Sequence, residues 1–488
     1  MSMLCLGLAG FVCRVSAQAP TWEKRYGLPE RTEFAFDAAE RPDGGFVLCG
    51  FKIGSDIWDC DGWVAAIDRL GDTLWTRRIG TMGFGAGADL LTSLVVDGDG
   101  DCLITGSKYR YSTRRGLWLV KFGADGTLLQ DRMYDGPDED NGHIIAADGG
   151  GRYIVVGDTR SYGSQSGGKD VWLLLLDGNG DTIRTMTFDF GAEDMGTAVL
   201  PRPDGTYLVT AVCCTANCGG MLQEGFSVLF LADSVGNILS LEKFDVGPKN
   251  KLMSISASPD GGILLVGSTS RWDEFPAEDV WLTKKDASFR DEWVRTYGMY
   301  GRYDGGIAAV PTADGGWFVA AYSQTFQSPG MNFDNWWLLR LDAKGDTLWT
   351  RWWGGPLNDD RHSICATSDG GLLIAGWFDA NSNPLYGLSI GNSDVYVVKA
   401  GPDGSVNGIP HVSMPSCRAK VYITPHPIRE EAFLRCSEQT DGAEFLVRDA
   451  LGREAARIAC FGDVAVFRKG SLPAGVYLLQ LVRQARIL

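Results

Sequence analysis

The chain has 488 residues, 44% of them hydrophobic, which is enough for one large globular domain and a smaller one. Its formal net charge of −16 argues against nucleic-acid binding, because phosphates are bound by clustered lysine and arginine. Its 64 glycines lack a triplet period, which excludes collagen, and the hydrophobic content excludes a wholly disordered chain. The sequence therefore predicts a globular protein rich in tight turns.

Residues 1–17 have the features of a secretory signal peptide. The apolar run from Met3 to Val12 is too short to span a bilayer, and the small residues Val15-Ser16-Ala17 follow it as a cleavage site. A basic segment before the apolar run is missing. We expect the remainder of the chain to be exported, without a transmembrane anchor.

Export would place the ten cysteines after residue 17 in an oxidising compartment, where disulfides form. Cys49 ends one expected strand and Cys60 precedes the next, so these two are a candidate pair. Cys213, Cys214 and Cys218 share one segment that lacks a nearby histidine and a zinc-ligand spacing. The sequence predicts disulfides or buried thiols, with no metal and no cofactor.

An Asp-Gly step recurs at intervals of 51 to 56 residues and indicates a repeat architecture. The clearest copy runs from Asp314 to Gly354. Each copy combines the Asp-Gly turn, short apolar runs, a second glycine turn and a run typically ending in Trp-x-x-x-x-Gly, a pattern typical of strands joined by hairpins. The steps are Asp43-Gly44, Asp97-Gly98, Asp148-Gly149, Asp204-Gly205, Asp260-Gly261, Asp314-Gly315 and Asp369-Gly370.

The third strand of most copies begins with an acid or amide two residues before an aromatic residue. An aromatic residue that recurs in every copy is best explained as core packing between copies. Copies two and four depart from the acidic pattern, with Gly116/Trp118 and Glu224/Phe226. The regular pairs are Asp61/Trp63, Asp170/Trp172, Asp279/Trp281, Asn335/Trp337 and Asp394/Tyr396.

Four strands in each of seven copies predict an all-β fold, a seven-bladed β-propeller over residues 20–408. The seventh copy lacks a fourth strand, and Trp22 to Gly27 matches the fourth strand of another copy, Trp293 to Gly298. We therefore expect the N-terminal strand to complete the last blade and close the ring. The repeats resemble those of bacterial extracellular seven-bladed β-propellers. Their second turn is similar to the Asp-box of sialidase propellers, which is structural there and implies no catalytic role.

The connections between strands 2 and 3 and between successive copies share one face of such a ring. They are long and variable here, so this face is the expected binding surface. Its aromatic residues and acids suit a glycan or a cation, and the alternative is that the acids cap loops. The four histidines form no metal-binding or catalytic pattern, and no catalytic residue is predicted. The candidate ligand-binding residues are Trp272, Tyr322, Trp377, Asp304 and Asp360.

Residues 409–417 are a predicted linker, and alternating apolar residues over 418–488 predict a small antiparallel β-sandwich. This region resembles the C-terminal sorting domain of type IX secretion cargo. His426 and the terminal segment Arg483–Leu488 depart from that family's pattern. The matching residues are Pro425 and Pro427, then Asp449, Gly452 and Arg453, then Leu472, Gly475 and Tyr477.

The resemblance implies that the type IX secretion machinery is a partner and that the protein reaches the cell exterior or the outer-membrane surface. With the propeller, it predicts an exported binding or adhesion module whose ligand is a glycan or a surface protein. Two alternatives stay open. One is a secreted polysaccharide-degrading enzyme that uses the long-loop face, and the other is a structural component of a surface layer.

Overall fold

The computed structural model divides the chain into two compact units, Met1–Ile409 and Pro410–Leu488. The predicted signal peptide, residues 1–17, and the predicted linker, residues 409–417, lie outside the described residues. The structure describes residues 20–27, 32–53, 59–80, 87–110, 114–163, 168–214, 225–244, 250–270, 277–298, 302–324, 334–353, 363–379, 393–406, 421–424, 431–436, 443–448, 454–459, 464–468, 478–483 and 486–487.

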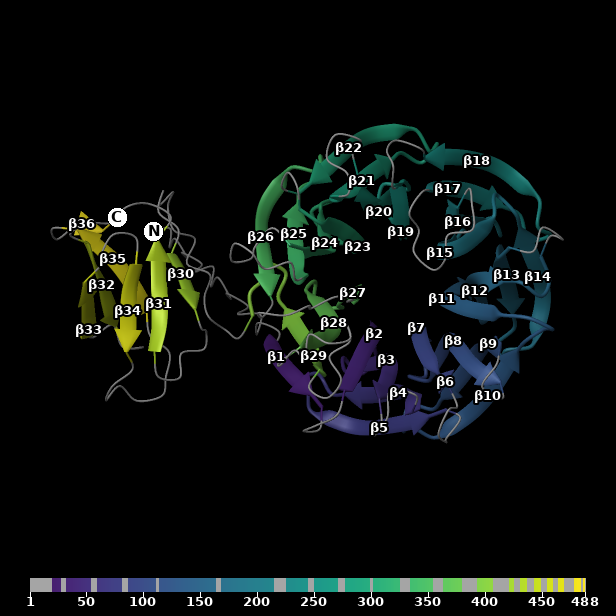
Figure 1. Ribbon diagram of the computed structural model, residues 1–488, viewed down its shortest axis with the longest axis horizontal. Helices are drawn as coiled ribbons and strands as arrows, with labels where there is room; N and C mark the ends of the chain where they lie inside the picture. Colours follow the sequence, from purple (N-terminus) through teal and green to yellow (C-terminus); the bar gives the residue numbers. More distant parts are fainter. Residues whose placement is uncertain are drawn as a thin grey trace, which may run out of the picture. The chain divides into compact units, whose positions relative to one another are not determined.

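The first unit is a ring of seven antiparallel sheets, which confirms the predicted propeller (Figure 1). We number the sheets as blades 1 to 7 in chain order. The innermost strands are β2 (Thr32–Glu40), β7 (Leu90–Val96), β11 (Asp140–Gly149), β15 (Glu193–Pro201), β19 (Asn250–Ala257), β23 (Asp304–Pro311) and β27 (Ser363–Ala366). The second strands are β3 (Phe46–Ile53), β8 (Cys102–Arg110), β12 (Arg152–Thr159), β16 (Tyr207–Cys214), β20 (Ile263–Thr269), β24 (Trp317–Ser323) and β28 (Leu372–Asp379).

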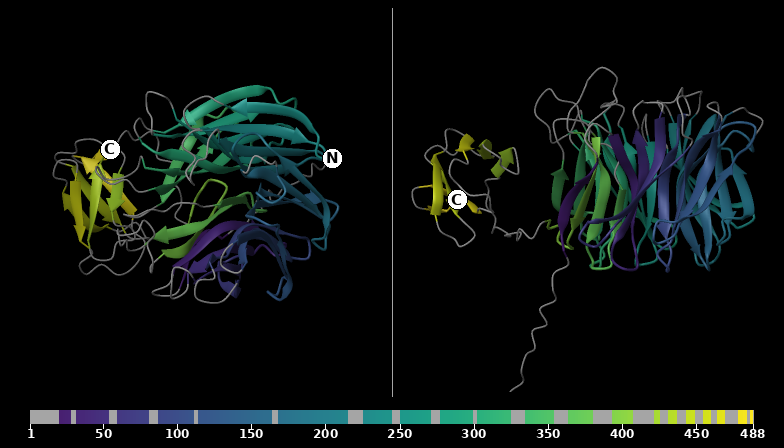
Figure 2. Two further views of the ribbon diagram at one scale, coloured as in Figure 1. Left: turned by 45° about the vertical axis from the view of Figure 1, so that its right-hand side comes forward. Right: turned by 90° about the horizontal axis from the view of Figure 1, so that it is seen from below.

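The third and fourth strands complete each blade toward the outside of the ring, and Figure 2 shows the blades from the side. In blade 1 a short strand, β6 (Gly87–Ala88), also pairs with β4. The third strands are β4 (Asp59–Ile67), β9 (Arg114–Phe122), β13 (Asp170–Leu176), β17 (Gly225–Ala232), β21 (Asp279–Lys285), β25 (Asn335–Leu341) and β29 (Ser393–Ala400). The outer strands are β5 (Thr73–Ile79), β10 (Leu128–Tyr134), β14 (Thr182–Phe188), β18 (Ile238–Phe244), β22 (Asp291–Tyr297), β26 (Thr347–Trp353) and β1 (Trp22–Tyr26).

The recurring aromatic residues of the third strands are buried between blades, as predicted. Trp172 of blade 3, for example, packs with Leu117 and Leu119 of blade 2. In blade 4, the prediction that Phe226 is the recurring aromatic residue is wrong. Trp172 lies opposite Gly157 in its sheet, and the residue in that register in blade 4 is Val228, opposite Ala211. Phe226 instead takes the position that the acid has in most other blades. The assignment from sequence was wrong because the aromatic pattern carries no information about strand register.

A second correction concerns the first turn of blade 2. Each such turn holds a glycine in the left-handed region, where a side chain would be strained. The sequence placed this turn at Asp97-Gly98, but the glycine with positive φ is Gly100, at 85°. The turn runs from Asp97 to Asp101, because the Gly100 amide donates to the Asp97 carbonyl. Two Asp-Gly steps lie side by side here, and the second corresponds to the steps of the other blades.

Strand β1 closes the ring by pairing with β29, with Arg25 opposite Tyr396, as predicted. Its side chains also donate hydrogen bonds to the second turn of blade 1. The Trp22 indole Nε1 donates to the Arg69 carbonyl at 2.9 Å, and the Tyr26 hydroxyl donates to the Gly71 carbonyl at 2.7 Å. In the same way, Trp293 and Tyr297 of blade 5 donate hydrogen bonds to the second turn of blade 6. The N-terminal strand therefore acts as an ordinary outer strand supplied from the far end of the sequence.

Four of the cysteines that the structure describes in the propeller are free thiols: Cys49, Cys102, Cys213 and Cys365. Cys49 pairs with Val64 and Cys60 with Ile53, so they are not cross-strand neighbours. The candidate disulfide between Cys49 and Cys60 is therefore absent from the described residues. The register of β3 and β4 separates the two residues along the ladder, which the sequence alone did not specify.

The second unit contributes two further sheets. One has the order β30-β31-β34 and the other β33-β32-β35-β36. The predicted sandwich stays a prediction, and all eight sorting-motif residues, from Pro425 to Tyr477, lie outside the described residues. The strands are β30 (Val421–Thr424), β31 (Glu431–Cys436), β32 (Ala443–Arg448), β33 (Glu454–Ala459), β34 (Val464–Arg468), β35 (Leu478–Arg483) and β36 (Arg486–Ile487).

Removing the indole of Trp22 should destabilise the ring. Trp22 is buried with Phe46, Leu48 and residues of blade 7, so Trp22→Ala loses both that packing and a hydrogen bond. We expect a loss of about 3–5 kcal/mol in the free energy of unfolding, measured by urea denaturation. The control is Lys24→Ala, which breaks a solvent-exposed ion pair with Asp72 and should cost less than about 1 kcal/mol. Equal effects of the two substitutions would contradict the closure by β1.

Candidate functional site

Buried acids gather at one edge of the ring, where the innermost and third strands begin. We call this the loop edge and the opposite one the turn edge. A buried carboxylate is costly unless donors or cations surround it, so each of these acids requires partners. The acids buried here are Glu33, Asp61, Asp89, Asp140, Asp158, Asp170, Asp194, Glu278 and Asp304.

The turn edge is uniform. In the second turn of blade 1, the Asp68 carboxylate accepts from the amides of Leu70 and Asp72, both at 2.8 Å. Each turn thus satisfies its own polar groups, in the manner of an Asx turn. The same bonds recur at Asp177, Asp233, Asp286 and Asp342. Blades 2 and 7 have Gly123 and Gly401 at this position of the second turn.

Two acids of the loop edge cap the connection that precedes their own strand. Asp140 accepts from the Gly136 amide at 2.8 Å and from the Ser161 hydroxyl at 2.8 Å. Asp194 accepts through Oδ2 from the amide of Phe190 at 2.6 Å. Loop capping, the alternative to ligand binding, accounts for these contacts.

Three of the five predicted ligand-binding residues are described, and all three lie at the loop edge. Asp304 and Tyr322 occupy neighbouring rungs of the β23–β24 ladder, and Trp377 takes the position of Tyr322 in the next blade. Asp304 is 0% exposed, whereas Tyr322 and Trp377 are half-buried. Trp272 and Asp360 lie outside the described residues.

Sequence reasoning missed an aromatic cluster beside Trp377, formed by Phe34, Phe36 and Phe51 of blade 1. Phe34 stacks on Phe51 with ring centroids 4.4 Å apart, and Trp377 meets Phe34 edge to face at 4.9 Å. Phe36 lies 5.3 Å from Phe51. Phe36, Phe51 and Trp377 are half-buried, unlike the recurring aromatic residues of the third strands. The signal was the Phe34-Ala35-Phe36 alternation, but strand β3 had to bring Phe51 alongside.

A polar cluster lies where blade 5 adjoins blade 6 at the loop edge, around Glu278. Its carboxylate accepts from the Ser268 hydroxyl at 2.9 Å and the Tyr322 hydroxyl at 3.4 Å, and it pairs with the Lys251 ammonium at 3.3 Å. The Tyr322 ring lies over Gly305, where an added Cβ would come within 2.3 Å of it. A glycine at this position therefore allows the tyrosine to reach the neighbouring blade.

A second polar cluster lies in blade 3 around the buried Asp158. This carboxylate pairs with the Lys169 ammonium at 3.0 Å, accepts from the Asn141 amide at 2.9 Å and contacts His143 Nε2 at 2.5 Å. Burial by itself would raise the pKa of Asp158, but these partners, His143 foremost, hold it well below its usual range. Asp158 is therefore an ionised carboxylate held by contacts within the fold, and these contacts already occupy its partners Lys169, Asn141 and His143.

Asp37 joins blades 1 and 2 near the axis of the ring. Its carboxylate accepts from the Leu94 amide and the Ser93 hydroxyl, both at 3.0 Å. Burial raises the pKa of Asp37 to about 6, and the hydrogen bonds oppose this shift in part. The folded protein therefore holds a proton on Asp37 at pH values where the unfolded chain has lost it.

Stability should fall between about pH 4 and pH 6 because of Asp37. A carboxyl group whose folded pKa is raised favours the folded state at low pH, and that advantage is lost as the pH rises through the folded value. Asp37→Asn cannot ionise, so its melting temperature should gain a few degrees on the wild type across this range. Ser93→Ala keeps the ionisable group and should keep the fall. Parallel pH profiles for the wild type and Asp37→Asn, measured by thermal unfolding, would contradict this role.

Within the described residues, no helix has the length and apolar character needed to cross a membrane. No protein-family model matches the chain, and no curated protein matches it.

The chain is similar to several solved structures at low sequence identity. PorZ, described as a bacterial surface component of the type IX secretion system of Porphyromonas gingivalis, is 13% identical with a TM-score of 0.40, and the match covers 91% of this chain and 57% of that one. A fungal alcohol oxidase in complex with copper is 11% identical with a TM-score of 0.43, covering 96% and 97%. An α-L-arabinofuranosidase from Fusarium graminearum is 12% identical with a TM-score of 0.42, covering 63% and 92%.

Proposed function

We propose that this chain is an exported β-propeller, displayed at the cell surface or released, that acts as a binding module through its loop edge. The observation that carries the proposal is the aromatic cluster of Phe34, Phe36, Phe51 and Trp377. Three of its rings keep part of their surface in solvent, whereas the recurring aromatic residues of the third strands are buried between blades. Partly exposed aromatic rings beside polar groups are typical of ligand-binding surfaces.

A glycan is the ligand class that these groups suit best. The rings of Phe51 and Trp377 offer apolar faces on which a sugar ring can stack. At the same edge, where blade 5 adjoins blade 6, Tyr322, Lys251 and Glu278 supply hydroxyl, ammonium and carboxylate groups, which pair with sugar hydroxyls. The chain is acidic overall, so a neutral or cationic glycan is favoured over an anionic one.

Trp377→Ala should weaken glycan binding by at least about tenfold, as expected for loss of a stacking aromatic residue. Trp352→Ala is a matched control, because Trp352 is an exposed tryptophan on the outer strand β26. The measurement is a glycan array followed by calorimetric titration of the glycans that bind. Equal affinity of the two variants would reject the loop edge as the binding surface. Turnover of a bound glycan would instead support the polysaccharide-degrading enzyme.

We also propose that residues 418–488 deliver the propeller through the type IX secretion machinery. The support is the ordered set of sequence motifs, of which Asp449, Gly452 and Arg453 form the central one. The proposed destination is the cell exterior or the outer-membrane surface. Delivery and binding are separable, since the aromatic cluster lies wholly in the propeller.

Deleting residues 418–488 should abolish surface delivery in a bacterium that has type IX secretion. The truncated chain should accumulate inside the cell envelope, because the machinery would no longer recognise its cargo. The measurement is immunodetection of the protein in surface, envelope and medium fractions. A full-length chain carrying Trp352→Ala is the control and should be delivered normally. Surface display of the truncated chain at the level of the full-length protein would reject the proposal.

A further inference from the structure

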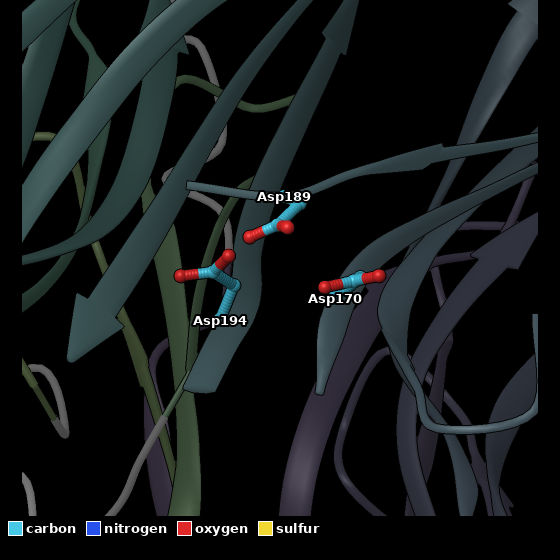
Figure 3. A group of neighbouring side chains, drawn as sticks. All are labelled: Asp170, Asp189 and Asp194. Atoms are coloured by element: carbon cyan, nitrogen blue, oxygen red, sulfur yellow. The ribbon is translucent and has the colours of Figure 1, made fainter. Parts of the chain in front are cut away.

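Three carboxylates meet where blade 3 adjoins blade 4 (Figure 3). Asp170 begins β13, Asp189 directly follows β14, and Asp194 lies in β15. One oxygen of each lies within 4.8 Å of an oxygen of the other two. Asp170 and Asp194 are each 1% exposed, and Asp189 is exposed. Two strand starts and one strand end therefore bring three negative charges together at the loop edge.

The equivalent junction between blades 1 and 2 is arranged differently. It has the corresponding buried acids, Asp61 and Asp89, but the residue after the outer strand is Gly80. A Cβ at Gly80 would come within 2.4 Å of Asp61 Oδ1 and 2.9 Å of Asp89 Oδ2. In that junction the Arg78 guanidinium supplies a positive charge, with Nε 2.5 Å from Asp61 Oδ2.

Blade 3 reverses both of these features. Phe188 pairs with Val171 as Ile79 pairs with Gly62, so Asp189 stands where blade 1 has Gly80, and Thr187 stands where blade 1 has Arg78. The junction has gained a carboxylate and lost the guanidinium. Three carboxylates at this distance repel one another unless a positive charge lies among them.

Asp194 provides an independent sign of a missing positive partner. Its Oδ2 accepts from the amides of Phe190 and Gly191, at 2.6 and 3.0 Å. Its Oδ1 is buried and accepts no hydrogen bond from a nitrogen or oxygen donor, and the remaining donor to this carboxylate is the Cys213 thiol, which is a weak one. The Asp194 carboxylate faces the carboxylate of Asp189 across the cluster (Figure 3). A buried carboxylate oxygen without a strong donor is expensive, and a cation bound between the carboxylates would satisfy it.

We propose that Asp170, Asp189 and Asp194 bind a divalent cation, and that this cation is Ca²⁺. The donors are all carboxylate oxygens, the ligands of hard cations. Ca²⁺ accepts irregular oxygen sets and completes its coordination with water, whereas Mg²⁺ requires near-octahedral geometry. The bound ion would join blade 3 to blade 4, as Arg78 assists at the junction of blades 1 and 2. This inference does not depend on the proposed function.

The test is thermal unfolding of the full chain after treatment with a chelator, with CaCl₂ alone as the added ligand. We expect the melting temperature to rise by about 2–4 °C at millimolar Ca²⁺, with half-saturation at about 0.1–1 mM, as in extracellular calcium modules. MgCl₂ at the same concentration should give a smaller rise. Calorimetric titration with CaCl₂ should report a single site.

Asp189→Gly should abolish the Ca²⁺-dependent rise, because it restores the residue that blade 1 has at this position. The matched control is Asp135→Asn. Asp135 holds the same position in blade 2, where Gly116 replaces the acid that begins the third strand, and this variant should keep the full response. Asp194→Asn should also lose it. If Asp194→Asn fails to fold, Asp189→Gly still decides, since Asp189 is exposed. A wild type without a saturable response, or Asp189→Gly with an unchanged one, would overturn the proposal.

Discussion

The fold depends on the pairing of β1 with β29. Each blade is a sheet with two apolar faces, and each face is buried only by the next blade. An open row of blades would leave two faces and two strand edges in water. The N-terminal strand removes this cost by completing blade 7, so two ends of the propeller sequence hold one another in place. The hydrogen bonds from Trp22 and Tyr26 to the second turn of blade 1 extend this closure to the adjoining blade.

Because the blades repeat one pattern, a position where one blade differs from the others indicates a local role. Positions that repeat in most blades, such as the buried aromatic residue of the third strand, serve the interfaces between blades. Positions that vary lie mainly at the loop edge, because the turns of the opposite edge satisfy their own polar groups and tolerate little change. The aromatic cluster, the Glu278 cluster and the carboxylates at the junction of blades 3 and 4 are three local departures at one edge. A ring of similar blades can thus carry different chemistry in different sectors while its core stays the same.

Much of this architecture follows from the sequence, because turn chemistry and hydrophobic patterning are local. The glycine turns, the strand count and the match between Trp22–Gly27 and Trp293–Gly298 were sufficient to predict a closed seven-bladed ring. The two misplaced positions, at Gly98 and at Phe226, have one cause. Where two similar dipeptides or two aromatic residues stand near each other, the sequence does not tell which one takes the repeated position, and strand register decides.

The sequence by itself predicted a ring with one long-loop face and placed Tyr322 and Trp377 on that face, where the structure also has them. Only the tertiary structure showed that Asp304 is fully buried, that Phe34, Phe36 and Phe51 adjoin Trp377, and that Asp170, Asp189 and Asp194 converge. The physical reason is distance along the chain. Turns and strands arise from neighbouring residues, whereas a site combines residues from different blades, and their meeting depends on how the sheets pack.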